Sequence, residues 1–222
     1  GGFITTVYIA VVAQFLGVML GLLSALAGLS RLWPLKLLSA AYVLVVRGTP
    51  VILQIFFIYY GSKILIGFDP FPRTVNVFTL AVSGAIVAGI TALAINEGAY
   101  MSEIIRAGIA SIDPGQMEAA KSVGMTRGMA MRRIILPQAA RVIVPPLGNE
   151  FNGMIKNTAL LAFIGVYEMF QDAEIQYSNT FLPVEYFGAA AVWYLLLTTI
   201  WSLIQAQIER RLGASERQEQ AG

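Results

Sequence analysis

Cysteine and histidine are both absent from the 222 residues of this chain. Without cysteine there are no disulfides, iron–sulfur clusters or thiolate zinc sites. Without histidine there is no Ser-His-Asp chemistry, no imidazole metal site and no histidine proton relay. Charge is scarce too, because Asp, Glu, Lys and Arg make up 13% of the residues, whereas soluble domains carry about 25%. The net charge of +2 is too small to indicate a nucleic-acid partner.

Apolar residues supply 57% of the chain, and they gather in long blocks. A helix needs about 20 mostly apolar residues to cross a bilayer. We therefore expect an all-α integral membrane protein with five transmembrane helices, forming a single domain over residues 1–222. The approximate spans are 3–29, 37–60, 75–107, 138–166 and 186–207. The chain starts without an initiator Met, so we expect some native residues to precede Gly1.

Gly and Pro mark the interruptions in this pattern. The sequence Arg47-Gly48-Thr49-Pro50 indicates a break inside the second span, which a membrane tolerates only where protein or a cavity covers the freed backbone groups. Pro145-Pro146 indicates a second break, in the weaker fourth span. Segments 61–75 and 167–185 are expected to be loops.

Lys and Arg are distributed unevenly between the connecting segments, and this bias sets the orientation of a membrane protein. Nine of them lie in one set of segments: Arg31, Lys36, Lys121, Arg127, Arg132, Arg133, Arg210, Arg211 and Arg217. The other set carries two, Lys63 and Arg73. We expect the first set in the cytoplasm, which places the N-terminus outside and the C-terminus inside.

The segment 113–125 between the third and fourth spans has the signals of a short helix. Asp113 suits an N-cap, and Pro114 suits the first helical position. Gly124 can take the left-handed conformation that ends a helix. Two alanines leave one side flat, which suits a helix lying in a groove of another protein. An ordinary amphipathic connector explains the same residues about equally well.

Four motifs occur together in an order that is typical of one known family. They are Arg47-Gly48-Thr49-Pro50; Gly98-Ala99-Tyr100 leading to Glu103-Ile104-Ile105-Arg106; Glu118-Ala119-Ala120 followed by Gly124 and Ile134-Ile135-Leu136-Pro137; and Pro145-Pro146-Leu147-Gly148-Asn149-Glu150-Phe151. Together they resemble the permease subunits of ATP-binding-cassette (ABC) importers, and most closely the polar amino acid permeases of the histidine, glutamine and arginine type. The resemblance covers about residues 3–212.

This resemblance implies a type I importer-like transmembrane domain in the bacterial cytoplasmic (inner) membrane. The cytoplasmic coupling (EAA) helix would cover about residues 114–124, between spans 3 and 4. Its implied coupling residues are Glu118, Ala119, Ala120, Gly124 and Met125. The implied partners are a cytoplasmic ATP-binding subunit, a second permease copy or paralogue, and an extracytoplasmic substrate-binding protein.

The nucleotide chemistry is expected to belong to the partner. The chain has no Gly-x-x-x-x-Gly-Lys-Ser/Thr phosphate loop, so we do not expect it to be an enzyme. ATP and Mg would be used by the separate ATPase subunit. We expect no cofactor and no metal in this chain.

Polar residues inside the spans mark the candidate substrate pocket, because such groups are costly in a membrane and usually line pathways or form pairs. The candidates are Asn96, Glu97, Tyr100, Glu150, Thr49 and Gln54. Carboxylates would meet an amino acid's ammonium group, and an Asn, a Thr or backbone amides would hold its carboxylate. The carboxylates favour a cationic amino acid, but glutamine-type permeases share the pattern. We therefore expect a polar amino acid as cargo.

Other interpretations fit some of these residues. Glu103 and Arg106 are spaced to pair on one helix face, and we favour that pairing over a ligand role. Glu97 and Glu150 are balanced between ligand binding and pairing between helices. Another small polar solute, a membrane adaptor and an ion-coupled transporter remain as alternatives, although ion-coupled transporters usually show two related halves and no repeat stands out here.

Overall fold

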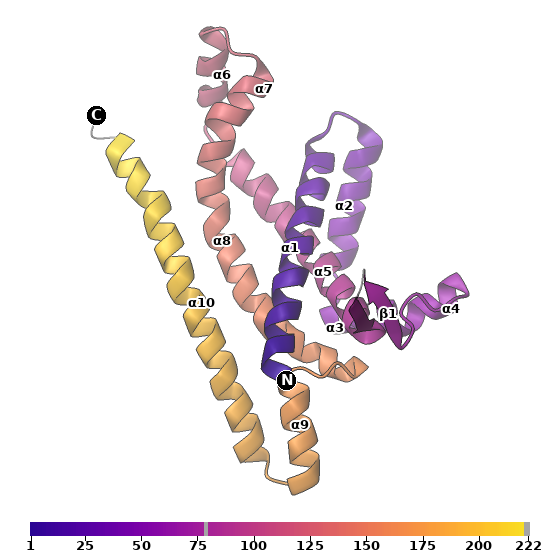
Figure 1. The fold of residues 1–222 in the computed structure, drawn as a ribbon. Helices are drawn as coiled ribbons and strands as arrows, with labels where there is room; N and C mark the ends of the chain where they lie inside the picture. The colour runs from indigo at the N-terminus through magenta and orange to yellow at the C-terminus, as the bar shows by residue number, and fades with distance from the viewer. Residues whose placement is uncertain (78–79, 220–222) are drawn as a thin grey trace.

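In the computed structural model, residues 1–77 and 80–219 are described, with the backbone alone at 76, 77, 80 and beyond 212. The fold is a bundle of long helices with one small hairpin (Figure 1). The elements are α1 (Gly2–Leu29), α2 (Trp33–Arg47), α3 (Val51–Phe56), a π-helical turn (Phe57–Gly61), α4 (Ser62–Ile66), β1 (Thr74–Val77), β2 (Leu80–Ser83), α5 (Gly84–Ala110), α6 (Pro114–Ser122), α7 (Arg127–Ala130), a second π-helical turn (Met131–Ile135), α8 (Leu136–Asn157), a 3₁₀ segment (Thr158–Ile164), α9 (Met169–Thr180) and α10 (Pro183–Glu219).

Three of the described helices, α1, α5 and α10, are long and apolar enough to cross a membrane. A fourth crossing is formed if α2 and the helical stretch Val51–Ile66 count as one span bent by 107°. α8 is not among these helices, and it carries Arg141, Glu150 and Lys156 within its 22 residues. The structure thus supports three or four spans by length and composition.

The core of the bundle is the contact between α1 and α5. Small residues on α1 let the two backbones approach, as is usual where membrane helices pack without a hydrophobic driving force. A Cβ atom added at Gly17 would lie 2.6 Å from Cβ of Glu97, and one at Gly21 would collide with the side chain of Met101. Ile9 and Leu93 are buried beside this contact. α1 therefore depends on glycine to reach α5.

The predicted break at Pro145-Pro146 is wrong, because α8 continues through both prolines. The neighbouring helix α10 holds this part of α8 from the side. Gln205 Nε2 on α10 donates to Pro145 O at 3.2 Å, and Trp201 Nε1 donates to Gly148 O at 2.7 Å. Proline is tolerated inside membrane helices where neighbouring helices pack against them.

Three segments that were expected to be loops or helix have a different structure. Residues 74–83 were assigned mainly to the start of the third span, but they form the antiparallel hairpin β1–β2, in which Thr74 pairs with Ser83 and Val75 with Val82. The expected loop 61–75 also contains the end of the helical stretch at α4. The loop expected over 167–185 is mostly helix α9, whose N-cap is Glu168. Short apolar runs do not distinguish strand from helix by periodicity.

The two ends of the bundle differ in content. Helices α6 and α7, the α1–α2 turn and the C-terminal end of α10 lie at one end, while the N-terminus and α9 lie at the other (Figure 1). The segments in which Lys and Arg are abundant therefore gather at one end of the molecule. Arg217 was counted among these residues, but the structure does not describe its side chain.

Candidate functional site

The helical stretch is bent by 107° at the break between α2 and α3. α2 ends at Arg47 with Gly48 as its C-cap, and Pro50, which has no N–H, precedes the first turn of α3. Gln54 closes the break, because its Nε2 donates to Val46 O at 2.7 Å and to Thr49 O at 3.0 Å. One side chain thus satisfies backbone carbonyls that the bend releases.

Three of the predicted site residues form one hydrogen-bonded chain at this break. Asn96 Nδ2 of α5 donates to Gln54 Oε1 at 3.1 Å. Gln54 Nε2 also donates to Thr49 Oγ1 at 2.9 Å, and Thr49 Oγ1 donates to Val45 O at 2.9 Å. The structure therefore brings Asn96, Gln54 and Thr49 together, and their side chains are hydrogen-bonded to one another.

A hollow lies on each side of the break. One, of about 360 Å³, is mainly apolar and is lined by Val45, Val46, Thr49, Leu53, Gln54, Phe57, Ile58 and Ile95. The other, of about 620 Å³, is lined by Gly28, Lys36, Ser39, Ala40, Val43, Leu44, Arg47, Gly48, Glu103 and Arg106. Both volumes suit a small ligand. The broken helix therefore separates an apolar space from a charged one.

Arg47 joins two further predicted residues to the charged side. Its guanidinium carbon lies 5.1 Å from the centroid of the Tyr100 ring, which is cation–π geometry. Its charge also acts on the half-buried Glu150 carboxylate of α8. Sequence reasoning left Arg47 out of the site, although it belongs to the Arg-Gly-Thr-Pro motif. Arg47 therefore interacts with both Tyr100 and Glu150.

The predicted pairing of Glu103 with Arg106 is confirmed. Arg106 donates through Nη2 to Glu103 Oε2 at 2.7 Å and through Nε to Glu103 Oε1 at 3.0 Å. Such a bidentate ion pair is strong and directional. Glu103 is therefore held at the wall of the charged hollow.

Glu97 makes its side-chain hydrogen bond to α1 and not to another predicted site residue. Its side chain is 4% exposed and lies against α1, where Gln14 Nε2 donates to Glu97 Oε1 at 2.7 Å. Gln14 Oε1 is buried without a hydrogen-bond partner among the described residues. Sequence reasoning missed Gln14, yet a lone glutamine in an uncharged apolar block was a usable signal. In this conformation Glu97 joins α5 to α1.

The helix expected over about 114–124 is present as α6, which spans Pro114–Ser122. Asp113 caps it, because Oδ1 accepts from Gly115 N at 2.8 Å. Gly124 has a φ of +84°, and its N donates to Lys121 O at 2.9 Å. Of the other predicted coupling residues, Glu118 and Ala119 are exposed, Met125 is partly exposed and Ala120 is buried. α6 thus presents a capped, largely solvent-facing helix.

Glu168 ties three elements together at the opposite end. The carboxylate is fully buried and accepts hydrogen bonds from Tyr194 OH at 2.7 Å, Gln171 N at 2.7 Å, Phe170 N at 2.9 Å and Thr6 Oγ1 at 3.4 Å. Burial raises the pKa of Glu168 above its ordinary value, and the four donors act in the opposite direction. The contact joins α1, α9 and α10.

Comparison with known proteins identifies the class to which this architecture belongs. Residues 17–214 match the family described as binding-protein-dependent transport system inner membrane component. The chain belongs to this family.

Similar sequences carry names from amino acid transport. The chain is 39% identical over 214 residues to the L-cystine transport system permease protein TcyB of Bacillus subtilis, covering 96% of this chain and 85% of that protein. It is 37% identical over 204 residues to the nopaline transport system permease protein NocQ of Agrobacterium fabrum, covering 90% and 84%. It is 33% identical over 210 residues to the glutamine transport system permease protein GlnP of Escherichia coli, covering 93% and 89%.

Solved structures agree with the fold. A crystal structure of an amino acid ABC transporter with histidines superposes with a TM-score of 0.83 at 40% identity, covering 95% of this chain and 92% of that one. An inward-facing structure of the MetNI methionine ABC transporter gives a TM-score of 0.75 at 18% identity, covering 95% and 94%. The second likeness speaks for the fold alone.

Proposed function

We propose that this chain is the permease subunit of an ATP-driven importer that moves polar amino acids into the cytoplasm. The observation that carries the proposal is the match of residues 17–214 to the family, together with relatives named for amino acid transport. The 40% identical structure is also that of an amino acid ABC transporter. Since the relatives are named for cystine, nopaline and glutamine, the cargo class is broader than any one of these amino acids.

The proposed topology has five spans in the bacterial inner membrane. The span added to the four described above is α8, which is fourth in chain order. Its 22 residues give a length of about 33 Å, enough for a hydrocarbon core of about 30 Å. The N-terminus and α9 would lie outside, while α6 and the C-terminus would lie in the cytoplasm. The gathering of the Lys- and Arg-rich segments at the α6 end supports this orientation (Figure 1).

The proposed coupling element is α6, seated in a cleft of a cytoplasmic ATPase subunit. Its support is a capped helix with exposed Glu118 and Ala119, followed by Gly124 in the left-handed conformation. ATP and Mg would bind in that partner. A second permease copy or paralogue and an extracytoplasmic binding protein would complete the importer.

The proposed ligand site lies around the break between α2 and α3. Glu150 would meet the ammonium group of the amino acid, and Arg47 suits its carboxylate through bidentate hydrogen bonds. Asn96, Thr49, Gln54 and Tyr100 would wall the site. Glu97 would influence the ligand only indirectly. Its carboxyl group is coupled electrostatically to Glu150, but its hydrogen bond is to Gln14 of α1.

Co-purification of an ATPase tests the proposed function. Gly124→Val should abolish the association, because a φ of +84° strains a β-branched residue although no atom lies within 4 Å of its Cβ position. Gly128→Val is the matched control, since Gly128 also has open space and its φ is not positive. The readout is the amount of ATPase retained by the affinity-tagged chain in mild detergent. If no ATPase accompanies the unsubstituted chain, the importer assignment fails.

A further inference from the structure

We propose that the turn between α9 and α10, residues Phe181–Val184, is the contact surface for the extracytoplasmic binding protein. The partner would present an apolar hollow with a basic rim. The inference rests on the proposed function, because it uses the proposed orientation and partner.

The turn exposes more apolar surface than a loop in water normally does. Phe181 is 77% exposed, Val184 is 80% exposed and Leu182 is 46% exposed. Pro183 lies between the last two. A contiguous apolar group of this kind marks a surface that contacts another protein or a membrane.

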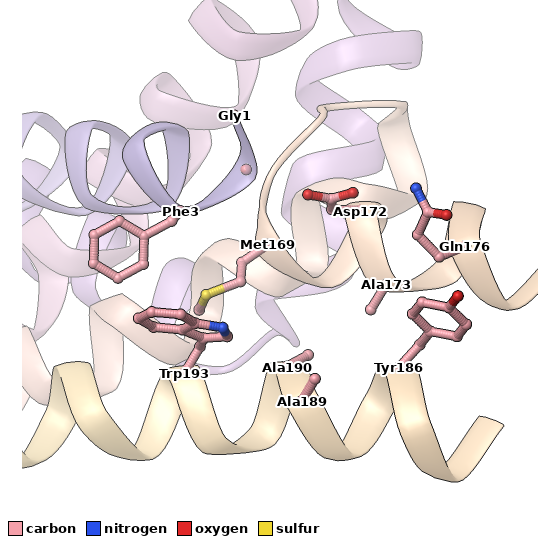
Figure 2. Close-up of a pocket in the computed structure, with 11 residues that line it drawn as sticks. Gly1, Phe3, Met169, Asp172, Ala173, Gln176, Tyr186, Ala189, Ala190 and Trp193 are labelled. Atoms are coloured by element: carbon pink, nitrogen blue, oxygen red, sulfur yellow. The ribbon is translucent and has the colours of Figure 1, made fainter. Parts of the chain in front are cut away.

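The position of the turn along the bundle favours contact with another protein over contact with the membrane. The Phe3 ring packs edge to face on Trp193 at 5.4 Å, so these residues mark one level (Figure 2). α1 has 28 residues, or about 42 Å, and already exceeds the hydrocarbon core of about 30 Å. Val184 precedes Trp193 by nine residues of α10, which adds about 14 Å. The turn therefore projects outward past the level at which α1 begins (Figure 1).

The backbone holds the aromatic side chain in place. Phe181 has a φ of +59°, the only positive φ among the described residues other than glycine. Its N donates to Tyr177 O at 2.7 Å, and its ring lies 6.4 Å from the Tyr177 ring. Residues in such disfavoured backbone conformations cluster at functional sites. An exposed aromatic group also suits the centre of an interface.

The charges around the turn determine the partner's chemistry. Glu174 and Glu185 flank it and are exposed, and Asp172 borders the cavity of about 360 Å³ between α9, α10 and the start of α1 (Figure 2). The sequence contains no Lys or Arg from 157 to 209. This acidic surface attracts a basic partner and opposes contact with anionic lipid.

The deciding experiment measures how the binding protein stimulates the complete importer. The transporter with its ATPase subunits is reconstituted in nanodiscs, and ATPase activity is titrated with the substrate-loaded amino-acid-binding protein encoded beside that ATPase. Phe181→Gly should raise the half-maximal concentration at least tenfold and leave the maximal rate unchanged. Glycine suits the left-handed φ, so the backbone is preserved, and an unchanged unfolding temperature would verify this. Phe68→Gly, at another exposed position with 61% exposure, should have no effect.

Three results would distinguish the possible failures. Because the chain has no cysteine, Phe181→Cys can carry a single environment-sensitive fluorophore. Quenching of that fluorophore by brominated lipid before the binding protein is added would assign the turn to the membrane and overturn the proposal. An unaltered half-maximal concentration in Phe181→Gly would overturn it as well. If no binding protein stimulates the unsubstituted importer, the proposed function fails and this inference fails with it.

Discussion

The two membrane carboxylates near the helix break lie in different surroundings. Glu150 is half-buried and faces the charge of Arg47, whereas Glu97 is buried against α1 with a glutamine amide as its donor. A buried carboxyl group without a cationic partner is costly to ionise. The residue that meets a ligand's ammonium group is therefore expected to be Glu150.

Replacing each carboxylate by its amide separates these roles. Glu150→Gln should raise the ligand concentration needed for half-maximal ATPase stimulation about tenfold, or ~1.4 kcal/mol, because a charge-assisted hydrogen bond is lost. Glu97→Gln should change it by about two- to threefold, since that group acts at longer range. The measurement is ATPase activity of the reconstituted importer across arginine, histidine and glutamine. Equal effects of the two substitutions would show that both carboxylates touch the ligand.

The sequence predicted which residues lie at the candidate site better than it predicted their hydrogen bonds. Motif positions and polarity identified Thr49, Gln54, Asn96 and Tyr100, and the structure places them at one break. Their partners could not be predicted, because Gln54 bonds to the carbonyls of a bend whose 107° angle no local pattern specifies. Direct contact of these residues with an amino acid stays a prediction.

At the scale of whole elements, the long apolar helices were the easiest to predict. α1 matches the expected span 3–29 almost residue for residue, because its apolar run ends at a basic turn. The β1–β2 hairpin and α9 were not predicted. Val75 and Val77 suit a strand or a helix, and Glu168, the N-cap of α9, also accepts hydrogen bonds from α1 and α10. Tertiary contacts decide such segments.

The closeness of α1 and α5 leads to a stability prediction. Gly21→Ala should destabilise the protein by about 1–3 kcal/mol, because the added methyl group overpacks the contact with Met101. Gly153→Ala is the control: it lies in α8 with open space around its Cβ position. It should leave stability unchanged or raise it by up to about 1 kcal/mol, since alanine favours a helix. Thermal unfolding in detergent measures both, and equal losses would contradict the packing argument.

The buried Glu168 predicts a pH dependence of the outer end. Its pKa is raised by burial, so the folded state binds a proton more tightly than the unfolded chain, whose glutamate titrates at about 4.3. The free energy of unfolding should therefore fall as pH rises from about 4 through the raised pKa.

Unfolding temperatures measured from pH 4.5 to 8 would check this dependence. Glu168→Gln should flatten the slope and also lower stability, because an amide nitrogen cannot accept from all four donors. Glu174→Gln, at an exposed position on the same helix, should leave the slope unchanged. A slope unaffected by Glu168→Gln would place the titration elsewhere.

For the whole molecule, the absence of cysteine makes the proposed topology directly measurable. Ser122→Cys at the end of α6 and Ser178→Cys on α9 are both at exposed positions. In intact bacteria with a permeable outer membrane, an impermeant maleimide should label Cys introduced at Ser178 and leave that at Ser122 unlabelled. In inside-out vesicles the pattern should reverse. Labelling of both positions from one side would contradict the proposed crossing of α8 between them.

The Thr6–Glu168 contact has a consequence for biosynthesis. Its two residues are 162 positions apart, so at synthesis rates of about 5–20 residues per second the first helix waits about 8–30 s for this partner. During that time α1 sits in the membrane with its outer end open, although α5 has already been made. The outer end can therefore close only late in translation, after Glu168 has been added to the chain.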